Sequence, residues 1–154
     1  MQRWSIPKAL LIGGGLAGLG DICFAISFAA YNGMTAERLL QVVASGLLGK
    51  AAFEGGLPTA VVGLVCHFAL SLMWMGLFLV AARRWPALVA WPWLAALGYG
   101  LLVFLTMRLV VLPLSAFPRP VSFAPLSSTL DLLSHIFLFA WPIVWATRKA
   151  STDA

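Results

Sequence analysis

The sequence predicts an all-α, polytopic membrane protein in which four transmembrane helices form a bundle and a short amphipathic helix links the first two. Hydrophobic residues make up 62% of the 154 residues and charged residues only 10%, whereas a soluble domain carries about 25% charged residues. The apolar residues gather in four runs, and most charges stand at the ends of those runs. Residues 1–154 are therefore predicted to form one integral membrane domain.

Four runs are long enough to cross a bilayer, which takes about 20 apolar residues in a helix. Arg83 and Arg84 close the second run, and Pro113 is predicted to end the third. The Pro-rich segment 117–125 then separates the third run from the fourth. The predicted spans are residues 9–31, 59–82, 90–112 and 126–147.

Between the first two spans, residues 36–49 are predicted to form a short amphipathic helix on the outer surface of the membrane. Thr35 is a suitable N-cap, and Glu37 stands in the first turn, where a negative charge favours a helix. Small and apolar residues recur at helical spacing: Leu39, Val42, Val43, Ala44, Gly46 and Leu47. This helix either tethers two spans or acts as a lid over whatever the bundle encloses.

Charged and aromatic residues predict the orientation of the spans. With four spans, both termini and the turn at 82–89 share one side, which holds most of the basic residues: Arg3, Lys8, Arg83, Arg84, Arg148 and Lys149. The other side holds only Arg38, Lys50 and Arg119. Basic segments stay in the cytoplasm, so both termini are predicted to be cytoplasmic. Most tryptophans gather at that same face, as in an aromatic belt: Trp4, Trp85, Trp91, Trp93, Trp141 and Trp145.

Five ionisable residues fall inside the predicted spans, where an unpaired charge costs several kcal/mol. A helical rise of about 1.5 Å per residue places Asp21, His67 and His135 roughly 13–15 Å below the outer surface, near the bilayer midplane. Arg108 and Asp131 lie about one turn nearer the outside. All four spans thus contribute polar groups to the outer half of the bundle.

Arg108 and Asp131 are predicted to form an ion pair, since they lie at equal depth on consecutive antiparallel helices. The pair serves either as a gate or as a brace that fixes the register of the third and fourth spans.

Asp21, His67 and His135 leave several interpretations open. They are candidates for a proton relay or a solute site, because imidazole titrates near neutral pH. They are also candidate metal ligands, or two axial haem ligands in the case of the histidines. The simplest interpretation is hydrogen bonding between helices. No His-x-x-His or Cys-x-x-Cys spacing is present, so no cofactor is predicted.

Gly13 to Gly18 reads GGGLAG and formally matches a dinucleotide-binding motif. It follows no strand and lies in a membrane span, so that function is excluded. Gly14 and Gly18 also form a G-x-x-x-G motif, which predicts close packing of the first helix against a neighbour.

The chain from residue 58 to residue 149 resembles the YagU-like small bacterial inner-membrane proteins, a family of unknown function. The matching features are His67 in the second span, RRWP at 83–86, LPLSAFP at 112–118 and SHIFLFAWPIVWATRK at 134–149. The resemblance implies a bacterial inner-membrane location. It implies no reaction and transfers no catalytic residues.

The functional prediction is a small inner-membrane protein that handles protons, ions or a small solute at a polar intramembrane site. The alternatives are a metal- or haem-bearing redox subunit, and a structural or assembly subunit of a membrane complex. No nucleophile elbow, P-loop or acyl-transfer motif favours an enzyme. The predicted partners are the lipid bilayer and either a second copy or a larger membrane complex. Nucleic acid is not expected, because the basic residues are explained by topology.

Overall fold

The computed structural model describes residues 3–151, and every regular element in that range is helical. Four helical stretches are long and apolar enough to cross a membrane: Ile6–Tyr31, Gly56–Arg84, Pro92–Leu114 and Pro125–Ala150. Each stretch overlaps one of the four predicted spans and ends within a few residues of it. The prediction of an all-helical chain with four candidate membrane spans is therefore confirmed.

The first two spans are single helices, whereas the third and fourth each contain a π-helical turn. The spans are α1 (Ile6–Tyr31), α3 (Gly56–Arg84), the series α5 (Pro92–Thr106), η2 (Met107–Val111) and α6 (Leu112–Leu114), and the series α7 (Pro125–Ser134), η3 (His135–Ala140) and α8 (Trp141–Ala150). The connections contain α2 (Ala36–Leu48), the 3₁₀ helix η1 (Gly49–Phe53) and α4 (Ala87–Ala90).

An N-cap residue and a turn at a glycine determine the short connection between α1 and α2. Thr35 is the N-cap of α2, as predicted, and its hydroxyl accepts a hydrogen bond from the backbone N–H of Arg38 at 3.1 Å. Gly33, in the turn before it, has a φ of +76°, which few residues other than glycine adopt. The chain can therefore reverse direction within a few residues and lay α2 across the end of the spans.

Both π-helical turns precede a proline. Pro113 follows η2, and Pro142 follows η3. A proline has no N–H, and its ring crowds the carbonyl four residues earlier. Those carbonyls belong to Leu109 and Leu138, inside the π-helical turns, where the wider helix relieves the crowding. Pro113 therefore does not end the third span as predicted, and the helix continues to Leu114.

Glycines bring α1 close to α3. A methyl group on Gly14 would lie 2.8 Å from the side chain of Leu72, and one on Gly18 would lie 2.8 Å from Phe68. The hydroxyl of Ser71 on α3 donates to the Gly14 carbonyl at 2.6 Å. The G-x-x-x-G motif thus packs α1 within the molecule, as in other close helix pairs in membranes.

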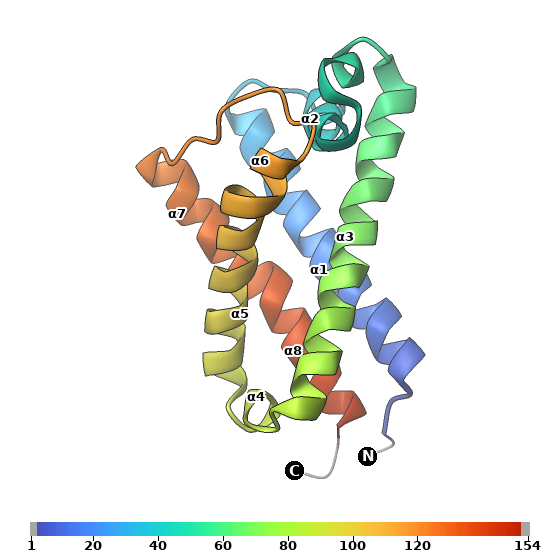
Figure 1. Ribbon diagram of the computed structural model, residues 1–154, viewed down its shortest axis with the longest axis vertical. Helices are drawn as coiled ribbons and strands as arrows, with labels where there is room; N and C mark the ends of the chain where they lie inside the picture. The colour runs from blue at the N-terminus through green and yellow to red at the C-terminus, as the bar shows by residue number, and fades with distance from the viewer. Residues whose placement is uncertain (1–2, 152–154) are drawn as a thin grey trace.

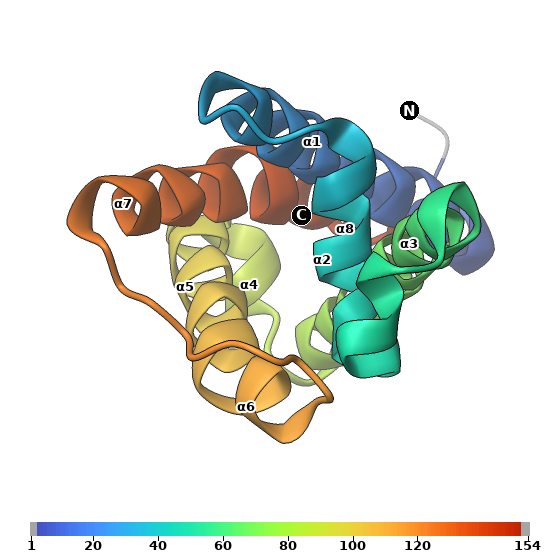
Figure 2. The ribbon, with the colours of Figure 1, turned by 90° about the horizontal axis from the view of Figure 1, so that it is seen from above.

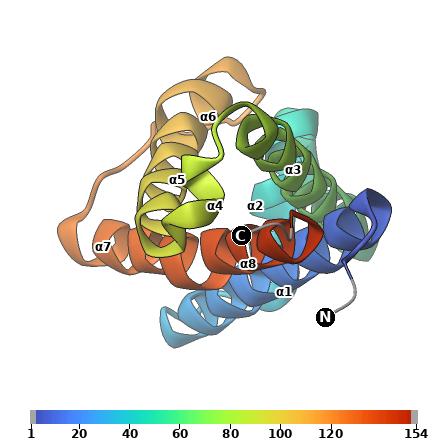
Figure 3. The ribbon, with the colours of Figure 1, turned by 90° about the horizontal axis from the view of Figure 1, so that it is seen from below.

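The helices divide the molecule into a packed half and an open half. α1 lies beside α8 and η3, with α3 and α5 on either side (Figure 2). Seen from below, α4 joins the ends of α3 and α5 (Figure 3). About midway along the two helices, the Tyr99 hydroxyl of α5 donates to the Trp74 carbonyl of α3 at 2.6 Å. Beyond it α3 and α5 separate toward the end that α2 covers (Figure 1).

The hydrophobic core fills the half next to α4. Its largest fully buried side chains come from α3, α5 and α8: Met75, Phe78, Val103, Ile143 and Val144. The N–H of Trp4 donates to the Lys149 carbonyl at 2.9 Å, so the start of α1 and the end of α8 meet at this same end. The α2 end of the molecule, by contrast, holds a cavity.

α2 is attached along one side to α3. A methyl group on Gly63 would overlap the backbone carbonyl of Leu40, so the two helices touch backbone to backbone. The buried Gln41 side chain donates to the Gly56 carbonyl at 3.1 Å. The face toward α3 is therefore partly polar, and it differs from the apolar face that the sequence pattern indicated.

Candidate functional site

A cavity of about 820 Å³ lies in the half of the molecule capped by α2. Its walls come from α3 on one side and from α5 and η2 on the other. α2 and the segment 115–122 cover it, and α1, α7 and η3 contribute one polar residue each. All five ionisable residues predicted from depth line this cavity: Asp21, His67, Arg108, Asp131 and His135.

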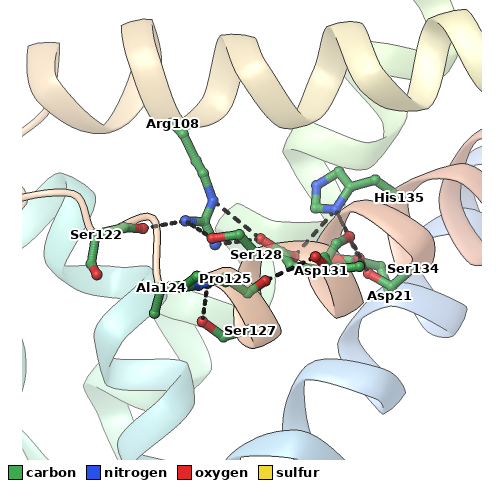
Figure 4. A network of polar contacts seen from close by, with 11 residues as sticks. Asp21, Arg108, Ser122, Ala124, Pro125, Ser127, Ser128, Asp131, Ser134 and His135 are labelled. Atoms are coloured by element: carbon green, nitrogen blue, oxygen red, sulfur yellow. Dashed lines mark hydrogen bonds and ion pairs between the residues drawn. The ribbon is translucent and has the colours of Figure 1, made fainter.

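Arg108 donates four hydrogen bonds to three acceptor atoms. Its Nη2 donates to Oδ2 of Asp131 at 2.8 Å and its Nε to the same oxygen at 3.3 Å. Its Nη1 donates to the Ser122 carbonyl and to the Ser128 hydroxyl, as Figure 4 shows. The guanidinium also lies 4.9 Å from the centre of the Phe104 ring, a cation–π contact. Arg108 therefore ties η2 to α7 and to the loop before α7.

His135 joins the two carboxylates. Its Nδ1 lies 2.8 Å from the Asp131 backbone carbonyl, 3.3 Å from Oδ1 of Asp131 and 3.9 Å from Oδ1 of Asp21. A carbonyl only accepts, so Nδ1 carries a hydrogen. Ser134 Oγ lies 3.3 Å from Oδ1 of Asp21 (Figure 4). Asp21, Ser134, His135, Asp131 and Arg108 thus form one connected polar cluster, which we call the back-wall cluster.

The back-wall cluster has a nearly balanced charge. The Arg108 guanidinium offsets the Asp131 carboxylate, which leaves the charge of Asp21 opposite His135. Asp21 and His135 therefore form a second polar pair in the cluster, beside the ion pair of Arg108 and Asp131.

His67 lies apart from the back-wall cluster. Its Nε2 donates to the Gly18 carbonyl at 2.8 Å, one turn from the bond between Ser71 and Gly14. The ring also meets Phe68 edge-on, with the ring centres 5.5 Å apart. Asp21 and His135 come together as the common depth suggested, whereas His67 faces α1 and joins two helices.

Each of the two histidines uses one ring nitrogen in a contact with a backbone carbonyl. Within residues 3–151, no three His, Cys, Asp or Glu side chains gather closely enough to hold a metal ion. The Nε2 of His67 is engaged by a backbone carbonyl, and Nδ1 of His135 by Asp131.

Sequence reasoning missed the rest of the cavity. Apolar side chains make up most of its surface, among them Leu70 and Met73 of α3 and Met107 and Val111 of η2. In the sequence these residues are indistinguishable from lipid-facing ones. Arg119 also lines the cavity, although the sequence suggested only a topological role for it. The sequence did offer one indication that Arg119 lines the cavity. Arg119 stands one residue before Pro120, in a loop that must fold over the spans.

Comparisons with known proteins identify no relative. No family model matches the chain, and no match was found among curated proteins or among solved structures.

Proposed function

We propose that this chain is a small inner-membrane protein that takes a small solute into its outer cavity and couples the site to a proton. The observation that carries the proposal is that all five intramembrane ionisable residues line one cavity. Polar side chains from four helices, at depths that differ by about one turn, would not need to line the same cavity if each served only to join two helices. The resemblance to YagU-like proteins supports a bacterial inner membrane as the location.

The proposed orientation has both termini in the cytoplasm and the cavity in the outer half of the bundle. The end that carries α4 holds Arg83 and Arg84 in the last turn of α3, and Arg148 and Lys149 in the last turn of α8. Basic residues favour the cytoplasmic side. α2 then lies as an amphipathic helix at the outer surface, as a roof fixed to α3 and, through the bond from the Ala116 N–H to the Gly46 carbonyl, to the loop beyond α6.

In this proposal Asp21 and His135 exchange the proton, and Arg108 and Asp131 position them. A solute that enters the cavity replaces water near the back-wall cluster and thereby changes the free energy of its charged form. Solute binding and proton binding are then linked, because each changes the equilibrium of the other. His67 has a structural role here, as a bond between α3 and α1.

The test is proton flux into liposomes that contain the purified protein and a trapped pH-sensitive dye. Under an imposed pH gradient we expect faster internal acidification than in protein-free liposomes. Asp21→Asn and His135→Gln should abolish the difference, whereas Arg84→Gln, a charge change outside the cavity, should retain it. Flux equal to that of protein-free liposomes, or unchanged flux in both cavity variants, would contradict the proton role.

A structural role in a membrane complex is the second candidate. It is favoured by the contacts of Arg108, whose guanidinium already makes four hydrogen bonds to three acceptor atoms within the chain. In that case the wild type and both cavity variants behave alike in the flux assay.

A further inference from the structure

The cavity combines an apolar interior with cations at its outer edge. Its side walls are formed by Ala69, Leu70 and Met73 of α3 and by Met107 and Val111 of η2. Ala69 and Met73 are exposed, so this wall continues onto the surface that faces lipid. A volume of about 820 Å³ is within the range of sites for whole organic ligands. Such a surface suits an alkyl chain that enters sideways from the bilayer.

Two arginines stand together at the covered end. The guanidinium of Arg38 lies 4.1 Å from the centre of the Phe53 ring, and that of Arg119 lies 5.4 Å from the same ring. Two guanidinium groups from separate segments therefore contact the same phenyl ring: Arg38 belongs to α2, and Arg119 belongs to the loop after α6. Arg119 lines the cavity itself.

Neither arginine has an anionic partner within residues 3–151, where the ion pairs of the carboxylates involve Arg108 and His135. Arg38 donates instead to the Gln41 side chain and to the Phe53 carbonyl. Like charges held close together repel, and a bound anion removes that repulsion. In the proposed orientation these arginines are also on the side where basic residues are disfavoured, so topology gives no reason for them.

The deep carboxylates argue against a cationic ligand. Asp131 is already paired with Arg108 at 2.8 Å, and Asp21 has Ser134 and His135 beside it. A ligand cation at this position would compete with groups that the fold supplies. The cationic charge without a partner is at the outer edge, and the arrangement is complementary to an anionic head rather than to an amine.

We propose that the cavity binds a single-chain anionic amphiphile from the membrane, with its phosphate or carboxylate head between Arg38 and Arg119 and its alkyl chain between α3 and η2. This inference rests on the cavity and the orientation of the proposed function. Arginine suits the head because its planar donors bind phosphate and carboxylate in a forked geometry. The roof formed by α2 and the loop after α6 brings the two arginines together, which gives that roof a role in recognition.

The test uses native mass spectrometry of the protein purified in a neutral maltoside detergent. The probes are hexadecyl phosphate, hexadecylphosphocholine and hexadecyltrimethylammonium, which share one chain and differ in net charge. We expect one hexadecyl phosphate per chain, bound about tenfold more tightly than either other probe. Excess inorganic phosphate should not displace it, because the head alone lacks the apolar contacts.

Four variants locate the ligand. Arg119→Gln, and Arg38→Gln with Arg119→Gln, should remove the preference for the phosphate probe. Arg83→Gln with Arg84→Gln changes two charges at the α4 end and should preserve it. Ala69→Trp fills the wall of the cavity from an exposed position and should weaken all hexadecyl probes. Within residues 3–151 the Arg119 guanidinium makes no hydrogen bond or ion pair and lies over the Phe53 ring. The single Arg119→Gln variant is therefore expected to fold, and it serves as the control for loss of folding in the double variant.

The outcomes separate this inference from the proposed function. Equal binding of all three hexadecyl probes, weakened by Ala69→Trp, would retain a solute cavity and overturn the anionic head. The anionic head would also be overturned if the Arg83→Gln, Arg84→Gln variant lost the preference for hexadecyl phosphate as fully as the Arg119→Gln variants. The preference would then depend on the total charge of the protein and not on the site. Displacement by inorganic phosphate would show that the chain has no role, and absence of any binding would remove the solute cavity as well.

Discussion

At the scale of single residues, the ion pair of Arg108 and Asp131 joins the third and fourth spans at a distance of 2.8 Å. The side chains are 17% and 33% exposed, so the pair is only partly shielded from solvent. Removing one partner leaves the other charge unpaired, and we expect Arg108→Gln or Asp131→Asn to lower the free energy of unfolding by about 1–3 kcal/mol. Unfolding of the purified protein in mixed micelles with a denaturing detergent measures this loss.

A double-mutant cycle is the control for that measurement. The variant with both Arg108→Gln and Asp131→Asn should lose clearly less stability than the sum of the single variants, because residues in direct contact are coupled. Arg84→Gln, at the far end of α3, should add independently to either change. Strict additivity of Arg108→Gln and Asp131→Asn would contradict a direct interaction.

His67 gives a second prediction at this scale. Its Nε2 donates to the Gly18 carbonyl, and hydrogen bonds between membrane helices contribute about 0.6 kcal/mol on average. We expect His67→Ala to lower the free energy of unfolding by about 1 kcal/mol and to leave proton flux into liposomes unchanged. If proton flux fell as far in His67→Ala as in His135→Gln, the result would contradict a purely structural role and would make His67 part of the proton relay.

The sequence predicted the depth of each polar side chain better than its direction. The depth of a side chain in the membrane follows from counting residues along its span. This count predicted equal depths for Arg108 and Asp131, and equal depths for Asp21 and His135. Direction depends on how each helix is rotated about its axis. For α1 that rotation is set by Gly14 and Gly18 against α3, a constraint whose partner helix the sequence does not name.

At the scale of elements, the contact between α2 and α3 determines the position of the roof. A methyl group on Gly63 would overlap the Leu40 carbonyl, which belongs to a backbone and cannot simply rotate away. We expect Gly63→Ala to shift α2 and to cost about 2 kcal/mol of stability, as overpacked sites do. Hydrogen–deuterium exchange should rise in the amides of Ala36–Leu48.

Gly98 on α5 is the matched control. A methyl group there has no atom within 4 Å, so Gly98→Ala should be neutral or stabilise the helix by up to about 1 kcal/mol. Exchange in α2 should not change. If Gly63→Ala left both stability and exchange at their original values, the close contact between α2 and α3 would be refuted.

The elements themselves were predictable where a simple length or composition rule applies. Four long apolar runs gave four spans, and Thr35 marked the start of α2. The π-helical turns before Pro113 and Pro142 were not predicted, because the same proline either ends a helix or is accommodated by widening it. The cavity was not predictable either, since it results from the separation of α3 and α5 beyond the contact of Tyr99 with Trp74.

At the scale of the whole molecule, the proposed orientation decides which solutes reach the cavity. If the α4 end is cytoplasmic, the roof formed by α2 and the loop after α6 faces the outside, and only solutes from that side or from the outer leaflet meet Arg119. The difference in basic residues between the two ends is the physical reason for this orientation.

Cysteine labelling tests the orientation in intact cells. Cys23 and Cys66 are replaced by alanine, and single cysteines are introduced at Ala124, in the exposed loop before α7, and at Ala87, in the exposed turn that holds α4. A membrane-impermeant maleimide should label Ala124→Cys in intact cells and Ala87→Cys only after permeabilisation. The reverse pattern would place the cavity toward the cytoplasm. The unpaired Arg38 and Arg119 would then be on the side where basic residues are ordinary, and the argument that they await an anionic head would lose one of its two supports.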